Sequence, residues 1–174
     1  QVHAQREYGF LPEDNRMDFL DELEKAVFFF DGALVTSGHR NPAWGTSDFT
    51  LIGLPDKANP GAWSELYEDK IARAKIEADR YEKIAEGIRK AKAEALRNRY
   101  TLQVYEQTNN LQNYPVRLIL ALNDYDTAKD ETARRDALET VAEVCDYFDV
   151  MRADLESVYS ETRFSSSPKV LFPI

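Results

Sequence analysis

The residue types that carry most enzyme chemistry are sparse in this sequence. Its two histidines, His3 and His39, fall in neither a His-Glu-x-x-His nor a Glu-x-x-His pattern, and a di-iron site in a helical bundle needs the second pattern on two helices. The chain also contains no glycine-rich phosphate loop and no Gly-x-Ser-x-Gly elbow. We therefore predict no catalytic residue, no metal ligand and no cofactor.

Carboxylates are abundant, and the adjacent pairs Asp21-Glu22 and Asp130-Glu131 are the candidates for an acid and a base. Adjacent residues on a helix point about 100° apart, so the two members of such a pair cannot flank one substrate bond. We therefore interpret both pairs as charged residues on solvent-exposed helix faces rather than as an acid and a base. The chain on its own is therefore not expected to be an enzyme.

The single cysteine, Cys145, excludes an internal disulfide. It falls on an apolar helical face, which is typical of a small buried hydrophobic residue rather than of a nucleophile. Aromatic side chains are the remaining candidates for binding a small molecule. Sugars bind exposed aromatic faces, and Trp44 and Trp63, at the loop end of the predicted helices, are the candidate surface residues for such binding. Packing at the edge of the core is the alternative role for both.

A heptad pattern within residues 62–111 predicts the long helix around which the chain is organised. Apolar residues recur there at alternating spacings of four and three, as in a coiled-coil seam: Tyr67, Ile71, Ala74, Ala78, Tyr81, Ala85 and Ile88. Beyond Ile88 the pattern weakens, although we expect the helix to continue to residue 111. A run of asparagines followed by Pro115 predicts a break or a kink between residues 109 and 115.

Three segments precede this helix. Residues 1–12 are predicted to be an irregular lead-in, and residues 13–37 a helix with a broad apolar face. Residues 38–61 are predicted to be a long structured loop, because four glycines and three prolines forbid a continuous helix there. Within the loop, residues 48–52 could be extended, and its apolar side chains are expected to attach it to the helices.

After the predicted break, residues 115–126 are expected to form a short helix or a kinked continuation. Residues 131–163 are predicted to form the last helix, and residues 164–174 an apolar tail. The last helix has a regular seam: Ala137, Val141, Val144, Phe148, Met151, Leu155 and Val158. Its length, about 50 Å, suits antiparallel packing along the long helix.

The net charge of −9 argues against a nucleic-acid partner, which requires an excess of Lys and Arg. The charge is uneven: residues 65–99 carry ten Lys or Arg against eight Asp or Glu, whereas residues 131–163 carry nine Asp or Glu against four Arg. These two helices are therefore expected to pair with each other. No run approaches the roughly 18 apolar residues of a membrane span.

These patterns together predict a single all-α domain over residues 1–174. We expect an elongated antiparallel bundle of three to four helices, with coiled-coil-like seams and one long structured loop. Its 174 residues are enough to bury a sizeable core.

Two helical phrases carry a resemblance to a known family: RNRYTLQVYEQTNNLQNYPVRLILALNDYD (97–126) and MRADLESVYSETR (151–163). Over about residues 60–163 the chain resembles the C-terminal helical region that follows the catalytic barrel in large gut-bacterial, Bacteroides-type family 20 glycoside hydrolases, the hexosaminidase-like proteins. Catalysis in that family depends on an Asp-Glu pair after a His-x-Gly-Gly motif. This chain lacks the motif, so no catalytic residue carries over.

The resemblance implies a non-catalytic helical accessory module of a periplasmic or secreted carbohydrate-degrading enzyme. Such a module would pack against an adjacent catalytic domain or form a homo-oligomer, with carbohydrate as the candidate ligand. Two alternatives stay open: a free-standing helical protein-interaction domain that recruits a partner through the loop around Trp44, and a ligand-binding bundle with a cavity between its helices.

Overall fold

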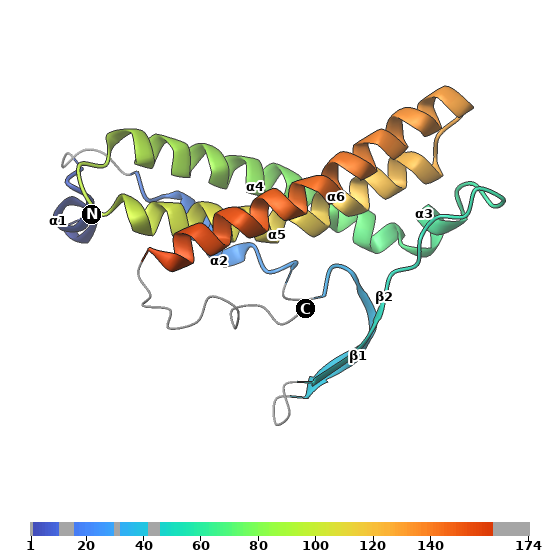
Figure 1. The fold of residues 1–174 in the computed structure, drawn as a ribbon, viewed down its shortest axis with the longest axis horizontal. Coiled ribbons are helices and arrows are strands. Elements are labelled where there is room, and N and C mark those ends of the chain that lie inside the picture. Colours follow the sequence, from blue (N-terminus) through green and yellow to red (C-terminus); the bar gives the residue numbers. More distant parts are fainter. Residues whose placement is uncertain (1, 11–15, 30–31, 42–45, 162–174) are drawn as a thin grey trace.

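The computed structural model describes residues 2–10, 16–29, 32–41 and 46–161, and it is mostly helical. Its elements are α1 (Val2–Tyr8), α2 (Phe19–Lys25), β1 (Val35–Asn41), β2 (Thr46–Leu51), α3 (Ala62–Leu66), α4 (Glu68–Glu94), α5 (Arg99–Asp126) and α6 (Glu131–Ser160) (Figure 1). The predicted all-α class is confirmed, apart from one two-stranded sheet in the described part of the chain. Within that part, no helix is long and apolar enough to cross a membrane.

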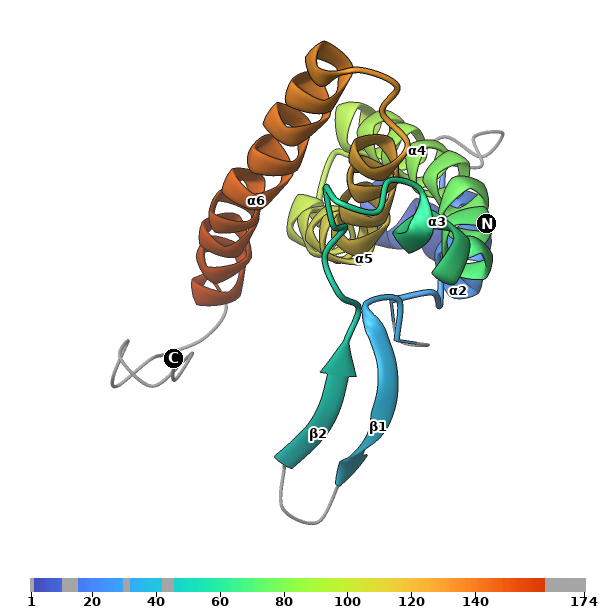
Figure 2. The same ribbon diagram turned by 90° about the vertical axis from the view of Figure 1, so that its right-hand side faces the viewer.

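The three long helices run antiparallel in chain order, and α5 lies between α4 and α6 (Figures 1 and 2). The predicted pairing of residues 65–99 with residues 131–163 is therefore wrong, because each of these helices packs on α5 instead. Tyr81 of α4 is fully buried, whereas Phe148 of α6 is 40% exposed. Hydrophobic burial against α5 thus decides the helix order, and the modest attraction between exposed charges does not.

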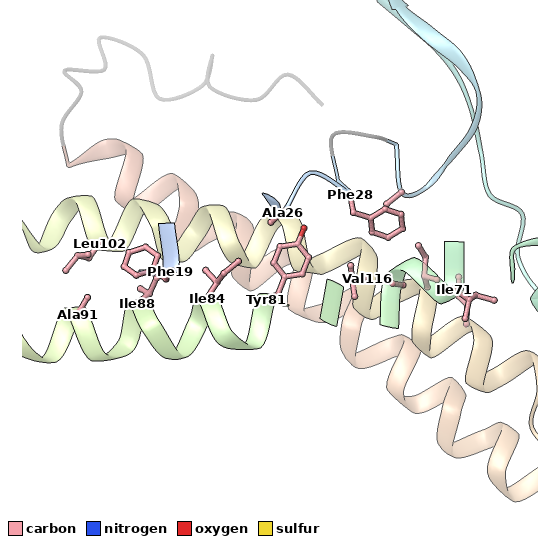
Figure 3. Close-up of a cluster of buried hydrophobic side chains, with 14 of the residues drawn as sticks. Phe19, Ala26, Phe28, Ile71, Tyr81, Ile84, Ile88, Ala91, Leu102 and Val116 are labelled. Carbon is pink, nitrogen blue, oxygen red and sulfur yellow. The ribbon is translucent and has the colours of Figure 1, made fainter. Parts of the chain in front are cut away.

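The main core lies between α4 and α5, with α2 closing one side (Figure 3). Its largest fully buried side chains include Tyr81, Ile84, Ile88, Leu102 and Ile119. The ring of Phe19 in α2 packs edge-on against Tyr105 of α5, with 5.7 Å between the ring centroids. Fully burying an aliphatic or aromatic side chain of this size stabilises the fold by about 1.5–3 kcal/mol, so this cluster accounts for much of the stability.

The predicted helix over residues 62–111 is divided into α3, α4 and the first part of α5. The chain turns back after Glu94, where Ala95 is extended (ψ 124°) and Asn98 has a left-handed backbone (φ 53°). The N-terminal segment holds this turn, because the Leu96 backbone N–H donates to the Tyr8 carbonyl at 2.9 Å. The prediction of continuity here is wrong, since the turn depends on residues distant in sequence.

Pro115 lies inside α5, so the helix continues through residues 109–115, where the sequence predicts a break or a kink. Proline in a helix interior costs about 3 kcal/mol, because it removes a backbone hydrogen bond and crowds the preceding turn. Pro115, Val116 and Ile119 are all buried, and this burial offsets that cost. Of the two forms predicted for residues 115–126, a short helix or a kinked continuation, the structure shows a continuation, because these residues are the second half of α5, which ends at Asp126 as predicted.

The N-terminal third departs most from the prediction. Residues 2–8 are helical rather than irregular, and the predicted helix over residues 13–37 is reduced to α2. Helix α2 ends at Lys25 because the next residue, Ala26, leaves the helical region (ψ 66°), and Gly32 follows with φ 78°. The buried side chains of Phe28 and Ala33 hold this non-helical stretch against the core.

β1 and β2 form an antiparallel hairpin that extends away from the helices (Figure 2). Its register pairs Val35 with Leu51 and Asn41 with Thr46. The loop predicted for residues 38–61 therefore contains most of β1 and all of β2, and residues 52–61 lack helix and strand. The expectation that apolar residues attach this segment holds for Ile52, which packs against the core, whereas Leu51 and Leu54 are exposed.

Helix α6 confirms the predicted last helix up to Ser160; Glu161 follows as its C-cap, and residues 162 and 163 of the prediction lie outside the described part of the chain. Asp130 caps its N-terminus, because the side-chain carboxylate accepts a hydrogen bond from the Ala133 backbone N–H at 2.8 Å. The tail predicted for residues 164–174 also lies outside the described residues.

Candidate interaction surface

Of the two tryptophans predicted to lie at the surface, Trp44 and Trp63, the structure describes only Trp63. Trp63 is buried, with 6% of its surface exposed, and its indole N–H donates to the Gly53 carbonyl. The Tyr67 ring packs edge-on against it at 5.0 Å, and the Tyr67 hydroxyl accepts from the Gly53 N–H at 3.2 Å. The surface position expected for Trp63 is therefore wrong, and its role here is packing. Trp44 lies outside the described residues, in the connection between β1 and β2.

Beside Trp63, the end of α5 holds α3 in place. The buried carboxylate of Asp126 accepts from the Ser64 backbone N–H at 2.8 Å, and the Asp126 carbonyl accepts from the Gly61 N–H at 3.1 Å. A carboxylate on the first N–H groups of a helix satisfies donors that lack an intrahelical partner. Asp126 therefore joins the end of α5 to the start of α3.

Helix α6 rests on α5 through a narrow line of buried side chains. Its four buried residues follow one another seven positions apart: Ala137, Val144, Met151 and Val158. We call this line the α6 seam. It coincides with part of the predicted seam, whose remaining members are less buried, Phe148 among them. A line this narrow covers only one side of the helix, so most of α6 faces solvent.

A second apolar line runs beside the seam. Leu138, Val141, Cys145 and Phe148 are spaced three, four and three residues apart, which places them along one side of the helix. We call these four residues the α6 stripe. Leu138 is 54% exposed, Phe148 is 40% exposed and Cys145 is exposed. The prediction that Cys145 is buried is wrong, because it follows the seam residue Val144 and so points about 100° away from it.

Tyr114 of α5 packs against the Phe148 end of this stripe. Its ring packs against Phe148 with 5.1 Å between the centroids. Burial raises the pKa of the Tyr114 hydroxyl, and the nearby Cys145 contributes in the same direction. Tyr114 therefore covers part of Phe148, whereas Cys145 and Leu138 are exposed to solvent. A partly exposed apolar line of this kind can accept another apolar element.

An open pocket of about 320 Å³ lies at the N-terminal end of α6, next to Leu138. It is lined by Lys57, Tyr125, Glu131, Arg134, Arg135 and Leu138. The Lys57 ammonium lies 3.1 Å from the Glu131 carboxylate, and the Arg134 guanidinium lies 3.4 Å from it. The hydrogen bond from Lys57 lowers the pKa of Glu131, so this carboxylate is ionised near neutral pH. The pocket thus holds solvated ion pairs.

The charge on α6 is strongly one-sided beyond the pocket. From residue 138 to residue 160 the helix carries six Asp or Glu and one Arg. Asp149 and Arg152 approach each other at 4.0 Å, and both side chains are well exposed. Such a pair contributes little to stability. Most of these acidic side chains point away from the stripe, whereas Arg134 lies one turn before Leu138 and Arg152 one turn after Phe148.

A group of buried polar residues lies on α4, away from this surface. The Arg80 guanidinium links the buried carboxylate of Glu77 at 2.6 Å with Glu22 of α2 at 3.3 Å. Burial raises the pKa of the Tyr81 hydroxyl to about 12, and the charge of Glu77 adds to this shift. The Tyr81 hydroxyl has no hydrogen-bond partner among the described residues. These groups join α4 to α2, and their arrangement is that of a structural ion-pair network.

No group of three or more potential metal ligands occurs among the residues that the structure describes. The sequence analysis missed Leu138, although a signal was available. Leu138, Val141, Cys145 and Phe148 have helical spacing of their own. Because Val141 and Phe148 also fit the predicted seam, the sequence pattern favours one apolar line on this helix instead of two.

Comparison with protein families, with characterised proteins and with solved structures finds no match.

Proposed function

We propose that this chain is a non-catalytic helical interaction module that docks another protein domain on its α6 stripe. The observation that carries the proposal is the exposure of Leu138, Cys145 and Phe148 on a helix that packs chiefly on one neighbour. Apolar residues scattered singly over a surface need no explanation, whereas a line of them at helical spacing is typical of a docking face. A domain seated there would complete the burial that α5 begins.

The resemblance to family 20 glycoside hydrolases suggests one specific partner. In that case the module packs against the catalytic barrel of a secreted or periplasmic carbohydrate-degrading enzyme, or pairs two such enzymes. A reading frame that continues into a barrel would support this form of the proposal. A frame without any catalytic domain would leave the free-standing interaction domain as the better description.

Cys145 provides a direct test, because it is the only cysteine and belongs to the stripe. Cells that produce the protein at its natural level are treated with a membrane-permeant maleimide, and labelling of Cys145 is followed by mass spectrometry. We expect Cys145 to react at least about tenfold more slowly in cells than in the purified chain, because the partner covers it. Equal rates would overturn the proposal. Full labelling of the denatured chain serves as the control for thiol oxidation.

The hairpin is the second candidate docking element, because β1 and β2 extend away from the helices (Figure 2). An isolated two-stranded hairpin is only marginally stable in water, and a third strand or a packed partner stabilises it. Exposed leucines, Leu54 and Leu66, lie on the segments that follow it. Replacing Trp44 with Ala should then abolish capture of a partner without changing the unfolding transition. Unchanged capture would exclude this route.

A further inference from the structure

We propose that the open pocket at the N-terminal end of α6 binds a small organic dianion, with a phosphate monoester as the ligand class. This inference goes beyond the proposed function, because the pocket would take a small molecule rather than a protein domain. Two observations carry it: three cations converge on one carboxylate there, and the size and lining of the pocket suit an anion with a small apolar group.

Three cations surround a single carboxylate in this pocket. The Lys57 ammonium lies 3.1 Å from the Glu131 carboxylate, and the Arg134 guanidinium lies 3.4 Å from it. The hydrogen bond from Lys57 lowers the pKa of Glu131 most, and the charges of Arg134 and Arg135 act in the same direction. Arg135 therefore lies near the same carboxylate. Because Glu131 is the one acidic residue of the lining, two positive charges have no negative counterpart within it.

The carboxylates around the pocket are engaged elsewhere. Four of them accept a hydrogen bond from another group: Asp56 from Ala58, Asp124 from Asn123, Asp126 from Ser64 and Asp130 from Ala133. Asp136 and Glu139 of α6 are also nearby in sequence, and neither forms an ion pair with Arg135 in the described part of the chain. The charges of these six residues weaken the positive potential of the pocket, but they leave its excess cations accessible to a ligand.

The size of the pocket and the rest of its lining determine the remainder of the ligand. Its volume of about 320 Å³ lies at the lower end of the range for small-molecule sites, about 300–1,000 Å³. Tyr125 and Leu138 add apolar surface to the lining. Guanidinium groups bind phosphate and carboxylate oxygens through charge-assisted hydrogen bonds. A phosphate monoester with a small apolar group would therefore match both the two excess cations and the apolar side chains.

The test is isothermal titration calorimetry of the purified chain with four ligands: phenyl phosphate, inorganic phosphate, benzoate and benzylamine. We expect phenyl phosphate to bind at least about tenfold more tightly than benzoate, which has the same ring and one negative charge. Inorganic phosphate should bind more weakly than phenyl phosphate because it lacks the ring, and benzylamine should not bind. Binding of phenyl phosphate should weaken below about pH 6, where a phosphate monoester loses its second charge, and also as salt rises.

Arg135→Gln and Arg152→Gln form a matched pair of variants. Each removes one positive charge from α6, and only Arg135 lines the pocket. Arg135→Gln should weaken binding of phenyl phosphate by at least about tenfold, whereas Arg152→Gln should change it by less than about twofold. Lys57→Gln gives a second measurement from outside the helix, and it should also weaken binding by at least about tenfold. Circular dichroism of the three variants checks the fold.

Several outcomes would overturn this inference. The first is no binding of phenyl phosphate at about 10 mM. The second is an equal loss in Arg135→Gln and Arg152→Gln, because the anion would then respond to the overall charge of α6. The third is benzoate or benzylamine binding as tightly as phenyl phosphate. None of these results bears on the proposed function, which depends on the labelling of Cys145 in cells.

Discussion

The side-chain amide of Asn98 donates one hydrogen bond to the Glu7 carbonyl at 2.8 Å and one to the Glu7 carboxylate at 2.9 Å, although 91 residues separate the two. Asn98 also has a left-handed backbone, with φ 53°. The turn between α4 and α5 is therefore fixed by its own conformation and by the N-terminal segment together. This relationship gives the first prediction.

Replacing Asn98 with Ala should destabilise the fold by about 1–3 kcal/mol, because it removes both hydrogen bonds and disfavours the positive φ. Asn98→Gly should cost less, since glycine keeps the backbone conformation and loses only the hydrogen bonds. Urea unfolding of the two variants separates these contributions. If both variants cost the same, the backbone conformation contributes nothing.

Gly87→Ala should destabilise the fold, although the same change stabilises most helices by about 1 kcal/mol. A Cβ atom built at Gly87 would lie 2.7 Å from the Cβ of Phe19, so α2 must shift to admit it. Overpacking of this kind costs about 1–3 kcal/mol, as measured by thermal unfolding. The cost should largely vanish in a Phe19→Ala background. Gly53→Ala is the control, because no atom lies within 4 Å of its added Cβ.

Tyr81 should make stability fall at high pH. Burial raises its pKa in the folded state to about 12, whereas in the unfolded chain it titrates near 10. Its contribution is therefore complete below pH 10 and is lost as the pH rises from about 10 to 12, by about 3 kcal/mol in all. The measurement is the free energy of unfolding of the wild type minus that of Tyr81→Phe at each pH. A difference that stays constant over this window would contradict the assignment.

Tyr81→Phe is also informative at pH 7, since the hydroxyl is buried without a partner among the described residues. Removing an unpaired buried hydroxyl should be neutral or should stabilise the fold by about 1 kcal/mol. Urea unfolding measures this change. A marked loss of stability would instead indicate a hydrogen bond to an internal water molecule.

Trp63→Phe should destabilise the fold by about 1–2 kcal/mol, because it removes the indole N–H that satisfies the Gly53 carbonyl. Trp63→Ala should cost about 3–5 kcal/mol, since a cavity is added to the lost hydrogen bond. Both values come from denaturant unfolding. A negligible effect of Trp63→Ala would mean that the side chain does not belong to the core.

The parts of the fold that depend on one neighbour were the ones that the sequence could predict. Helix α6 packs chiefly on α5, so its buried residues follow a simple heptad and its end at Ser160 lies close to the predicted one. Helix α4 contacts both α5 and α2, and a single-seam template misassigns it. Ile84 is fully buried, whereas the predicted seam placed the more exposed Ala85 at that turn.

The features that the sequence could not predict depend on distant contacts. Nothing local indicates that the turn before Asn98 is held by Glu7, or that burial permits Pro115 inside α5. β1 contains polar residues without clear alternation, and only its pairing with β2 defines it as a strand. The candidate surface was missed for a related reason, because whether Leu138 and Cys145 are covered depends on how α6 is rotated against α5.

The single-neighbour position of α6 has a consequence for motion. Helix α6 buries four side chains along one side, whereas the core between α4 and α5 buries many more. Separating α6 from α5 should therefore cost less free energy than opening that core. We expect α6 to open as a separate cooperative unit, with its backbone amides exchanging for deuterium well before those of α5. A molecule bound across α6 would therefore slow this opening. Slower deuterium exchange of the α6 amides would then detect binding even if the rest of the protein stayed unchanged.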